Sequence, residues 1–220
     1  GQLHVLLEYI DSTKVNIDVF QRLAVDLENH NRVSRIVDLN NGVISAAAES
    51  SEDAVVIEGS RMTHSLSPMY RLLILGAGDV AKFVAEMAIA LEYDVTLCDP
   101  RPNYLDNWHV AGVETTAQLP DDVVRERFSN PYSGIIALAH DPRVDDMALM
   151  EALKTNAFYI GAMGSIKTSA ARRERLPELG LNDKEISRLH APIGFQIYSK
   201  TPAEIAIAVM AEVTAVRYQN

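Results

Sequence analysis

The fold class is decided by the stretch Arg71-Leu72-Leu73-Ile74-Leu75-Gly76-Ala77-Gly78-Asp79-Val80-Ala81. The apolar run is typical of a buried strand, and a helical pattern over residues 79–91 follows the glycine turn directly. Gly76 allows a tight turn, Gly78 lets the backbone approach a pyrophosphate, and Ala81 allows close helix–strand packing. We therefore predict a phosphate-binding turn at the start of a helix, with the site residues Gly76, Ala77, Gly78, Asp79 and Val80.

Strand and helix patterns alternate through the rest of the chain. We expect further strands at residues 95–98, near Val113, and at 134–139 and 158–160, with helices at 121–128, 145–154, 167–178 and 202–217. Thr201, Pro202 and Glu204 form a capping-box signature for the last helix. Because such alternation implies right-handed crossovers, the pattern predicts an α/β domain over residues 70–220 with a Rossmann-like, doubly wound parallel sheet.

Residues 1–66 predict a small α+β segment. We expect a strand at 3–10, a helix at 16–28 capped by Asn16, strands at 32–39 and 43–48 joined by the turn Asn40-Asn41-Gly42, and a further strand at 54–58. The polar stretch 59–68 carries Gly and Pro and is expected to be the linker. The sequence enters its first strand pattern at Gly1 with no Met, so we expect this segment to be incomplete.

Composition excludes several classes of protein. The formal net charge of −10 disfavours nucleic-acid binding, because such a surface repels phosphates. No run approaches the roughly 18 apolar residues of a membrane span, and no secretion signal opens the chain. Cys98 is the single cysteine, so no intrachain disulfide can form. A reducing, cytoplasmic setting is therefore our default expectation, and a homodimer is the default for the oligomeric state.

An acid follows the second strand, about twenty residues after the glycine turn. Asp99 stands where such folds bind a ribose hydroxyl, whereas Arg101 could pair with a 2′-phosphate, so NAD and NADP both stay open. The carboxylate of Asp79 would compete with an anionic ligand for the helix amides. The alternative is that the glycines serve packing alone.

Two further motifs follow strands at the same predicted sheet edge. His140 opens the run His140-Asp141-Pro142-Arg143 and could contact a ligand or move a proton, while Asp145 could simply cap the next helix. Gly164 and Ser165 end a second glycine-rich turn, Gly161-Ala162-Met163-Gly164-Ser165, which is a second candidate anion cradle. At least two of the arginines that follow, among Arg172, Arg173 and Arg175, are expected to be surface charges. His190 is expected to be structural.

Together these motifs resemble the XdhC/CoxI family of xanthine dehydrogenase accessory proteins. The resemblance is carried by residues 72–78, Asp99-Pro100-Arg101-Pro102, His140-Asp141-Pro142, residues 159–165, His190-Ala191-Pro192-Ile193-Gly194 and residues 201–206. It implies a cytoplasmic chaperone that holds the molybdenum cofactor, as molybdopterin or its dinucleotide. It also implies two partners, a cysteine desulfurase that sulfurates the cofactor and the apo molybdenum hydroxylase that receives it.

The family's Cys-containing N-terminal module is absent from this sequence, so we assign no metal ligand. The alternative function is an NAD(P)-dependent oxidoreductase acting on a small substrate, with His140 as the proton donor. A nucleotide-sensing regulator without chemistry is a third possibility. If the chain is an accessory protein, no catalytic residue is expected.

Overall fold

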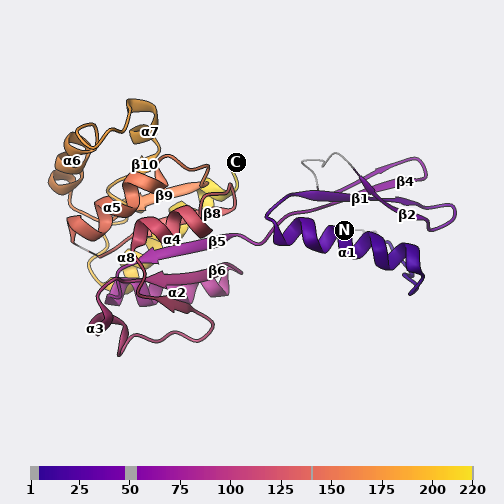
Figure 1. Cartoon of the computed structure of the whole chain (residues 1–220), viewed down its shortest axis with the longest axis horizontal. Coiled ribbons are helices and arrows are strands. Elements are labelled where there is room, and N and C mark those ends of the chain that lie inside the picture. Colours follow the sequence, from indigo (N-terminus) through magenta and orange to yellow (C-terminus); the bar gives the residue numbers. More distant parts are fainter. Residues whose placement is uncertain (1–4, 48–53, 140, 220) are drawn as a thin grey trace. The chain divides into compact units, whose positions relative to one another are not determined.

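The computed structural model describes residues 5–47, 54–139 and 141–219. Contacts between residues divide the chain into two compact units, Gly1–Pro68 and Met69–Asn220 (Figure 1). His140, which the sequence singled out as a candidate proton donor, lies outside the described residues. No helix in the described ranges is long and apolar enough to cross a membrane.

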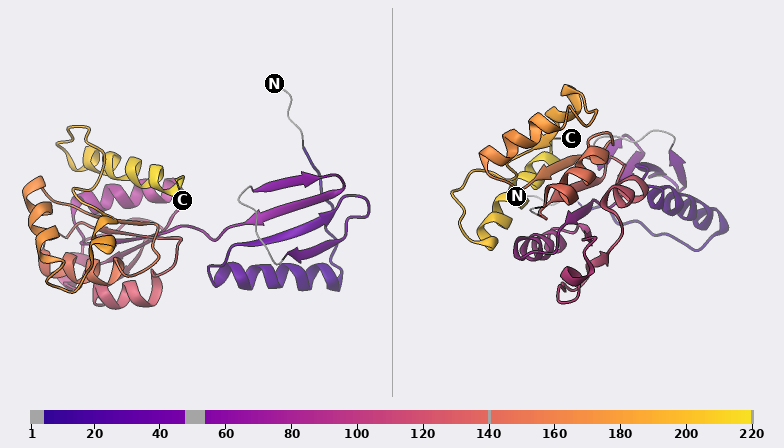
Figure 2. Two further views of the ribbon diagram at one scale, coloured as in Figure 1. Left: turned by 90° about the horizontal axis from the view of Figure 1, so that it is seen from above. Right: turned by 60° about the vertical axis from the view of Figure 1, so that its left-hand side comes forward.

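The first unit is an antiparallel sheet with one helix against it (Figure 2). The sheet has the order β2-β1-β4-β3, and its elements are α1 (Lys14–Glu28), β1 (Val33–Asp38), β2 (Ile44–Ala47), β3 (Val55–Glu58) and β4 (Arg61–Leu66). Val37, Ile44 and Met62 form its small core, and Val19 and Phe20 of α1 pack against them. The helix thus covers one face of the sheet with its apolar side.

Three expectations for this unit were wrong. Helix α1 begins at Lys14 after the N-cap Thr13, not at Asn16, and residues 5–10 form no strand. The stretch expected to be the linker contains β4, which lies inside the sheet. Its polar side chains suit a central strand because they are paired across it: Ser65 Oγ lies 2.9 Å from Ser34 Oγ, a buried contact.

The second unit has a six-stranded, fully parallel sheet with the order β10-β9-β8-β5-β6-β7. Its strands are β5 (Arg71–Leu75), β6 (Asp94–Cys98), β7 (Glu114–Thr116), β8 (Ser133–Ala137), β9 (Tyr159–Ala162) and β10 (Leu189–His190). Numbered from β5 and read from β7 to β10, this is the order 3-2-1-4-5-6 of dinucleotide-binding folds. The predicted fold class, a doubly wound α/β sheet, is confirmed.

Helices cover both faces of this sheet (Figure 1). On one side α2 (Asp79–Ala90) packs against α8 (Pro202–Arg217), and on the other α4 (Pro120–Arg127) packs against α5 (Pro142–Ala152). The capping box of Thr201 and Glu204 is present as predicted. The remaining helices are α3 (Pro102–Leu105), α6 (Ile166–Arg175) and α7 (Asp183–Ser187), of which α3 and α7 were not predicted, nor was β10.

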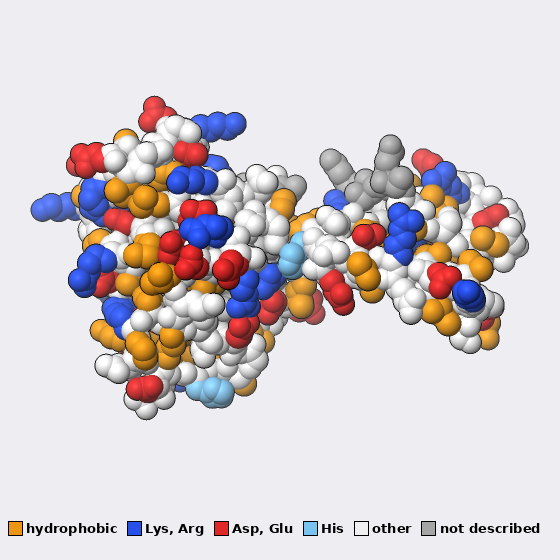
Figure 3. All heavy atoms as spheres, in the orientation of Figure 1, with side chains coloured by type: hydrophobic (Ala, Val, Ile, Leu, Met, Phe, Trp, Pro, Cys, Tyr) orange, Lys and Arg blue, Asp and Glu red, His pale blue; other side chains and the backbone are white. Residues whose placement is uncertain are grey.

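Acidic and basic side chains are interspersed on the face shown in Figure 3.

Candidate functional site

The site is built where the chain reverses its direction of travel across the sheet, between β5 and β8. These strands are parallel neighbours, so the glycine turn after β5 and the loop after β8 meet at one edge. Leu138 N donates to Leu75 O at 2.9 Å and holds the two strand ends together. Open α/β sheets bind ligands in the crevice at this switch point.

The two glycines of the first turn have different roles. Gly76 has φ +94°, and a Cβ on it would lie 2.4 Å from Ala139 Cα, so only glycine fits there. Gly78 has φ −104°, and a Cβ on it would meet no heavy atom within 4 Å. Gly76 is therefore required by packing, whereas Gly78 borders open space at the N-terminus of α2.

The N-terminus of α2 has unused donors. No hydrogen-bond acceptor for the backbone amides of Asp79 and Val80 is found in the described part of the chain. The competing hydrogen bond that we expected from the Asp79 carboxylate is not present either, among those same residues, and Asp79 is exposed. Free amides together with the positive end of the helix dipole suit an anionic group.

Asp99 lies beside this turn but is enclosed. Its carboxylate is fully buried and accepts hydrogen bonds from Ala77 N at 3.0 Å, from Arg101 N at 3.0 Å, and from the Arg101 guanidinium at 2.8 Å through both Nε and a terminal nitrogen. Burial by itself would raise the pKa of Asp99, but these hydrogen bonds outweigh it and hold the pKa below its ordinary value. A ribose contact by Asp99, as predicted from the sequence, would require Arg101 to move aside.

A small cavity of about 280 Å³ adjoins Arg101, between the carboxyl ends of β6 and β8. Arg101 and Arg143 line it, and each is paired with an acid, Arg101 with the buried Asp99 and Arg143 with Asp141, the N-cap of α5. The other lining side chains are largely apolar: Pro100, Leu119, Pro120, Val144 and Met147. Such a slot suits a flat ring attached to an anionic group. Leu119, Pro120 and Met147 carry no motif, and sequence reasoning missed them.

Behind the crevice lies a buried ionic cluster that connects the loops after β8 and β9. Arg172 is 2% exposed and donates to Asp145 at 3.4 Å, to Asp146 at 2.9 Å and to Met163 O at 3.2 Å. Asp145 in turn accepts a hydrogen bond from Ala139 N at 3.1 Å. Since Ala139 lies against Gly76, the cluster supports the loop that borders the glycine turn.

Burial dominates the titration of Asp145. It raises the pKa of Asp145 to about 6, although the Ala139 amide and the Arg172 guanidinium act in the opposite direction. The expected helix-capping role of Asp145 is wrong, because Asp141 is the N-cap of α5. The expectation that at least two of the three arginines are surface charges is also wrong, because Arg172 is buried and Arg173 donates to the carbonyls of Ile186 and Leu189.

The second glycine turn lies at the same edge of the sheet, since β9 is parallel to β8. With two strand spacings between β5 and β9, the two turns are separated by about 10 Å. Gly161 packs on Ile193, and a Cβ there would approach its side chain to 2.6 Å. Ser165 caps α6, because its Oγ accepts from Thr168 N at 3.1 Å. The hydroxyl of Ser165 is thus engaged, while the buried Ser169 Oγ has no partner among the described groups.

His190 is the last residue of β10, in register with Gly161, and takes part in a network with Glu212. Its Nδ1 is 3.2 Å from a Glu212 oxygen, and its ring stacks on Tyr159 with 4.7 Å between centroids. The described residues contain no group of three His, Cys, Asp or Glu side chains that could hold a metal ion. Cys98 is buried, and desolvation together with the neighbouring Asp99 raises its pKa to about 12, so its thiol is not a ready metal ligand.

Comparison with known proteins identifies the family. The model of the XdhC Rossmann domain matches residues 72–213, which is most of the second unit. The chain belongs to the XdhC family. The match spans the glycine turn, the Asp99–Arg101 pair and the buried Arg172 cluster.

Curated proteins of related sequence carry informative names. The chain is 30% identical over 150 residues to the molybdenum cofactor insertion chaperone PaoD of Escherichia coli, covering 68% of this chain and 41% of that protein. It is 27% identical over 154 residues to a Bacillus subtilis protein named as a probable xanthine dehydrogenase subunit, covering 69% and 44%. The chain therefore spans about two fifths of the length of these relatives.

The fold recurs in a solved structure. The crystal structure of a xanthine dehydrogenase from Bacillus halodurans matches with a TM-score of 0.72 and 22% identity, covering 94% of this chain and 68% of that one. The match extends beyond the Rossmann domain, because 94% of the chain is more than the second unit alone. At this identity the likeness concerns architecture.

Proposed function

We propose that this XdhC-family chain serves the maturation of a molybdenum hydroxylase of the xanthine dehydrogenase type. In this role it holds a phosphate-bearing pterin cofactor, molybdopterin or its dinucleotide, at the switch-point crevice. The observation that carries the proposal is the open N-terminus of α2, where Gly78 borders free space and the amides of Asp79 and Val80 have no acceptor among the described residues. The printed name of the PaoD relative supports the cofactor class.

The residues of the crevice fit the organic part of such a cofactor. Amides of the glycine turn would take a phosphate group, and the slot beside Arg101 and Arg143 would take a ring or a second phosphate. The described residues do not fit the metal, because Cys98 is buried and no ligand cluster is found among them. When bound, the cofactor supplies the redox chemistry of the client enzyme, and the chain's own task is to hold it.

An open crevice suits a carrier better than an enzyme. Gly78 and Asp79 are exposed, so a ligand held there stays within reach of a partner protein. We infer two such partners, a cysteine desulfurase that sulfurates the cofactor and the apo molybdenum hydroxylase that receives it. We also propose that the chain acts in the cytoplasm and as a homodimer.

The test is direct binding to the full chain. Stabilisation by a ligand follows RT ln(1 + [L]/Kd), so molybdopterin at 100 times its Kd should raise the free energy of unfolding by roughly 2.7 kcal/mol. Gly78→Asp should abolish this effect, since it places a carboxylate where the phosphate would lie. Gln21→Glu adds the same charge on the exposed side of α1 in the first unit and should leave binding unchanged. Equal binding by the wild-type chain and Gly78→Asp would show that the ligand does not lie at this turn.

A second candidate is an NAD(P)-dependent oxidoreductase, and the strand order 3-2-1-4-5-6 favours it. Against it, Asp99 faces Arg101 and Ala77 with no exposed surface. We expect NAD(H) and NADP(H) to stabilise the chain less than molybdopterin does. Substrate-dependent oxidation of NAD(P)H at enzymatic turnover would reverse the order of the two functions.

A further inference from the structure

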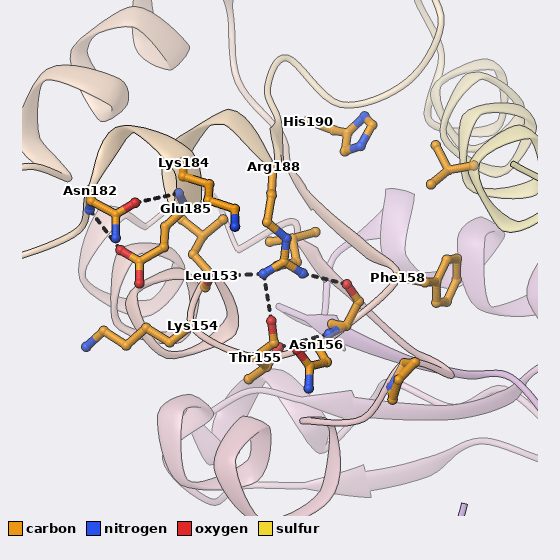
Figure 4. A pocket seen from close by; sticks show the side chains of 14 residues that line it. Leu153, Lys154, Thr155, Asn156, Phe158, Asn182, Lys184, Glu185, Arg188 and His190 are labelled. Carbon is orange, nitrogen blue, oxygen red and sulfur yellow. Dashed lines mark hydrogen bonds between the residues drawn. The ribbon is translucent and has the colours of Figure 1, made fainter. Parts of the chain in front are cut away.

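A second cavity in this unit is lined by no residue of the Gly76–Ala81 turn. It has a volume of about 720 Å³ and is lined from the amino ends of β8 and β9, from α7 and from the last turn of α8 (Figure 4). Pro131 and Phe158 shortly precede the strands that border it, whereas the crevice described above lies at the carboxyl ends. A cavity of this size suits a small organic ligand.

The charge of the cavity is opposite to that of the protein. Lys154, Lys184 and Arg188 line it, against the single acid Glu185, in a chain of net charge −10. Glu185 belongs to the capping box of α7, where it accepts from Asn182 N at 2.8 Å. Figure 4 shows the Lys184 side chain reaching toward Arg188, while Lys154 extends away from it. Lys184 and Arg188 are neighbouring cations, and the one acid, Glu185, is already hydrogen-bonded within α7. This arrangement favours an anion between the two cations.

The floor of the cavity is rigid. The Arg188 guanidinium donates to three carbonyls, those of Leu153 at 3.0 Å, Thr155 at 2.6 Å and Ala157 at 2.7 Å. These bonds fix the segment between α5 and β9 against the end of α7. The Arg188 guanidinium is therefore held in place before any ligand arrives, which lowers the entropic cost of binding to it.

The opposite wall carries an oriented histidine. Glu212 accepts from Tyr159 Oη at 2.5 Å and from Gly194 N at 2.8 Å, and its other oxygen lies 3.2 Å from His190 Nδ1. Burial would raise the pKa of Glu212, but these hydrogen bonds hold it below the ordinary value, so the carboxylate is the acceptor and Nδ1 the donor. Nε2 is then the ring nitrogen left for a ligand. Phe158, Ile160 and Val216 provide apolar surface nearby.

From these features we propose a second ligand site, for a small organic anion. The ligand is a phosphate monoester or carboxylate whose charged group lies at Lys184 and Arg188. Its apolar body rests on the surface that leads to His190. This site is separate from the cofactor crevice, and the proposal stands whether or not the crevice binds a pterin.

Nuclear magnetic resonance of the full chain tests the proposal with three matched probes: phenyl phosphate, benzoate and neutral benzyl alcohol. We expect the two anions to shift the backbone resonances of Ala157, Arg188 and His190 while that of Gly78 stays in place. Lys184→Glu should weaken binding by about tenfold or more, because it replaces an attractive charge with a repulsive one. His190→Gln, which keeps the size and polarity of the side chain, should weaken it by a smaller factor.

Lys200→Glu is the control, since it makes the same charge reversal on an exposed lysine outside the cavity. Binding that survives Lys184→Glu, equal shifts with benzyl alcohol, or shifts confined to the Gly76–Asp79 turn would each overturn the second site. The first two outcomes concern residues that the cofactor crevice does not use, and the third would place the anion at the glycine turn, so none of them counts against the proposed function.

Discussion

The carboxylate of Asp99 accepts a hydrogen bond from the backbone amide of Ala77 at 3.0 Å. The acid at the end of β6 thereby holds the middle of the glycine turn at the end of β5. Arg101 completes the arrangement, because it binds both oxygens of the same carboxylate and its guanidinium lies 3.9 Å from the centroid of the Tyr104 ring. The turn is thus shaped from the side by a buried ion pair before any ligand binds.

Replacing Asp99 should destabilise the fold. Asp99→Asn removes the charge that faces Arg101 and should lower the free energy of unfolding by about 2–3 kcal/mol, somewhat less than a fully buried pair because Arg101 is partly exposed. Urea denaturation near neutral pH measures the change. Asp94→Asn, at the start of the strand that Asp99 follows, is the control, since Asp94 is half-exposed, and it should cost less than about 1 kcal/mol. Equal losses in the two variants would contradict the role of the buried pair.

The same carboxylate predicts a dependence on acid. The folded pKa of Asp99 lies below its ordinary value of 3.8, so its contribution is present above pH 3.8 and is lost as the pH falls through the folded pKa. The free energy of unfolding of the wild-type chain should therefore fall to that of Asp99→Asn only in strong acid. Denaturation of both chains across the acidic range, compared at each pH, measures this. If the difference in free energy of unfolding between the two chains vanished well above pH 3.8, the lowered pKa of Asp99 would be contradicted.

Asp145 should show the opposite sign. Its folded pKa of about 6 lies above the ordinary 3.8, so between these values the folded state holds a proton that the unfolded state releases. The contribution of Asp145 to stability should therefore increase as the pH falls through about 6 and decrease again as it rises. Asp145→Asn cannot titrate and should lack this slope. If the free energy of unfolding changed with pH in the same way in the wild-type chain and in Asp145→Asn between about pH 5 and 7, the raised pKa of Asp145 would be disproved.

Arg172 should be the most sensitive charged position near the crevice. Arg172→Ala leaves Asp145 and Asp146 without their buried partner and should cost about 3–5 kcal/mol. Arg172→Lys keeps the charge but cannot reach Asp146, Asp145 and Met163 O together, so it should restore only part of the loss. Thermal or urea denaturation compares them. Lys167→Ala, an exposed position on α6, should change stability little.

The two glycines of the turn should separate stability from binding. Gly76→Ala places a Cβ 2.4 Å from Ala139 Cα at a positive φ and should destabilise the chain by about 2 kcal/mol or more. Gly78→Ala meets open space at an ordinary φ and should leave stability within about 1 kcal/mol. If the cofactor lies at the turn, Gly78→Ala should still weaken its binding. The reverse pattern, with Gly78→Ala the less stable variant, would show that the turn is packed differently.

Much of the second unit was predictable because its signals are local. The glycine turn, the apolar strands and the capping box of α8 each depend on residues within a few positions of one another, and all three appear in the structure. Strand β4 was missed because its polar side chains resemble a linker in sequence. Only the pairing of Ser65 with Ser34, which lie 31 residues apart, makes them compatible with a central strand.

The sequence by itself determined the doubly wound sheet and the glycine turn at its switch point, since backbone geometry and apolar periodicity specify both. Tertiary structure alone decided which polar groups stay open at the sheet edge and which face each other. Arg172 resembles a surface charge among other arginines, yet folding buries it against Asp145, 27 residues away. Asp99 stands in a ligand-binding position of the sequence, yet Arg101 and Ala77 occupy its carboxylate. The reason is that burial and pairing of a charge depend on neighbours that only long-range packing brings together.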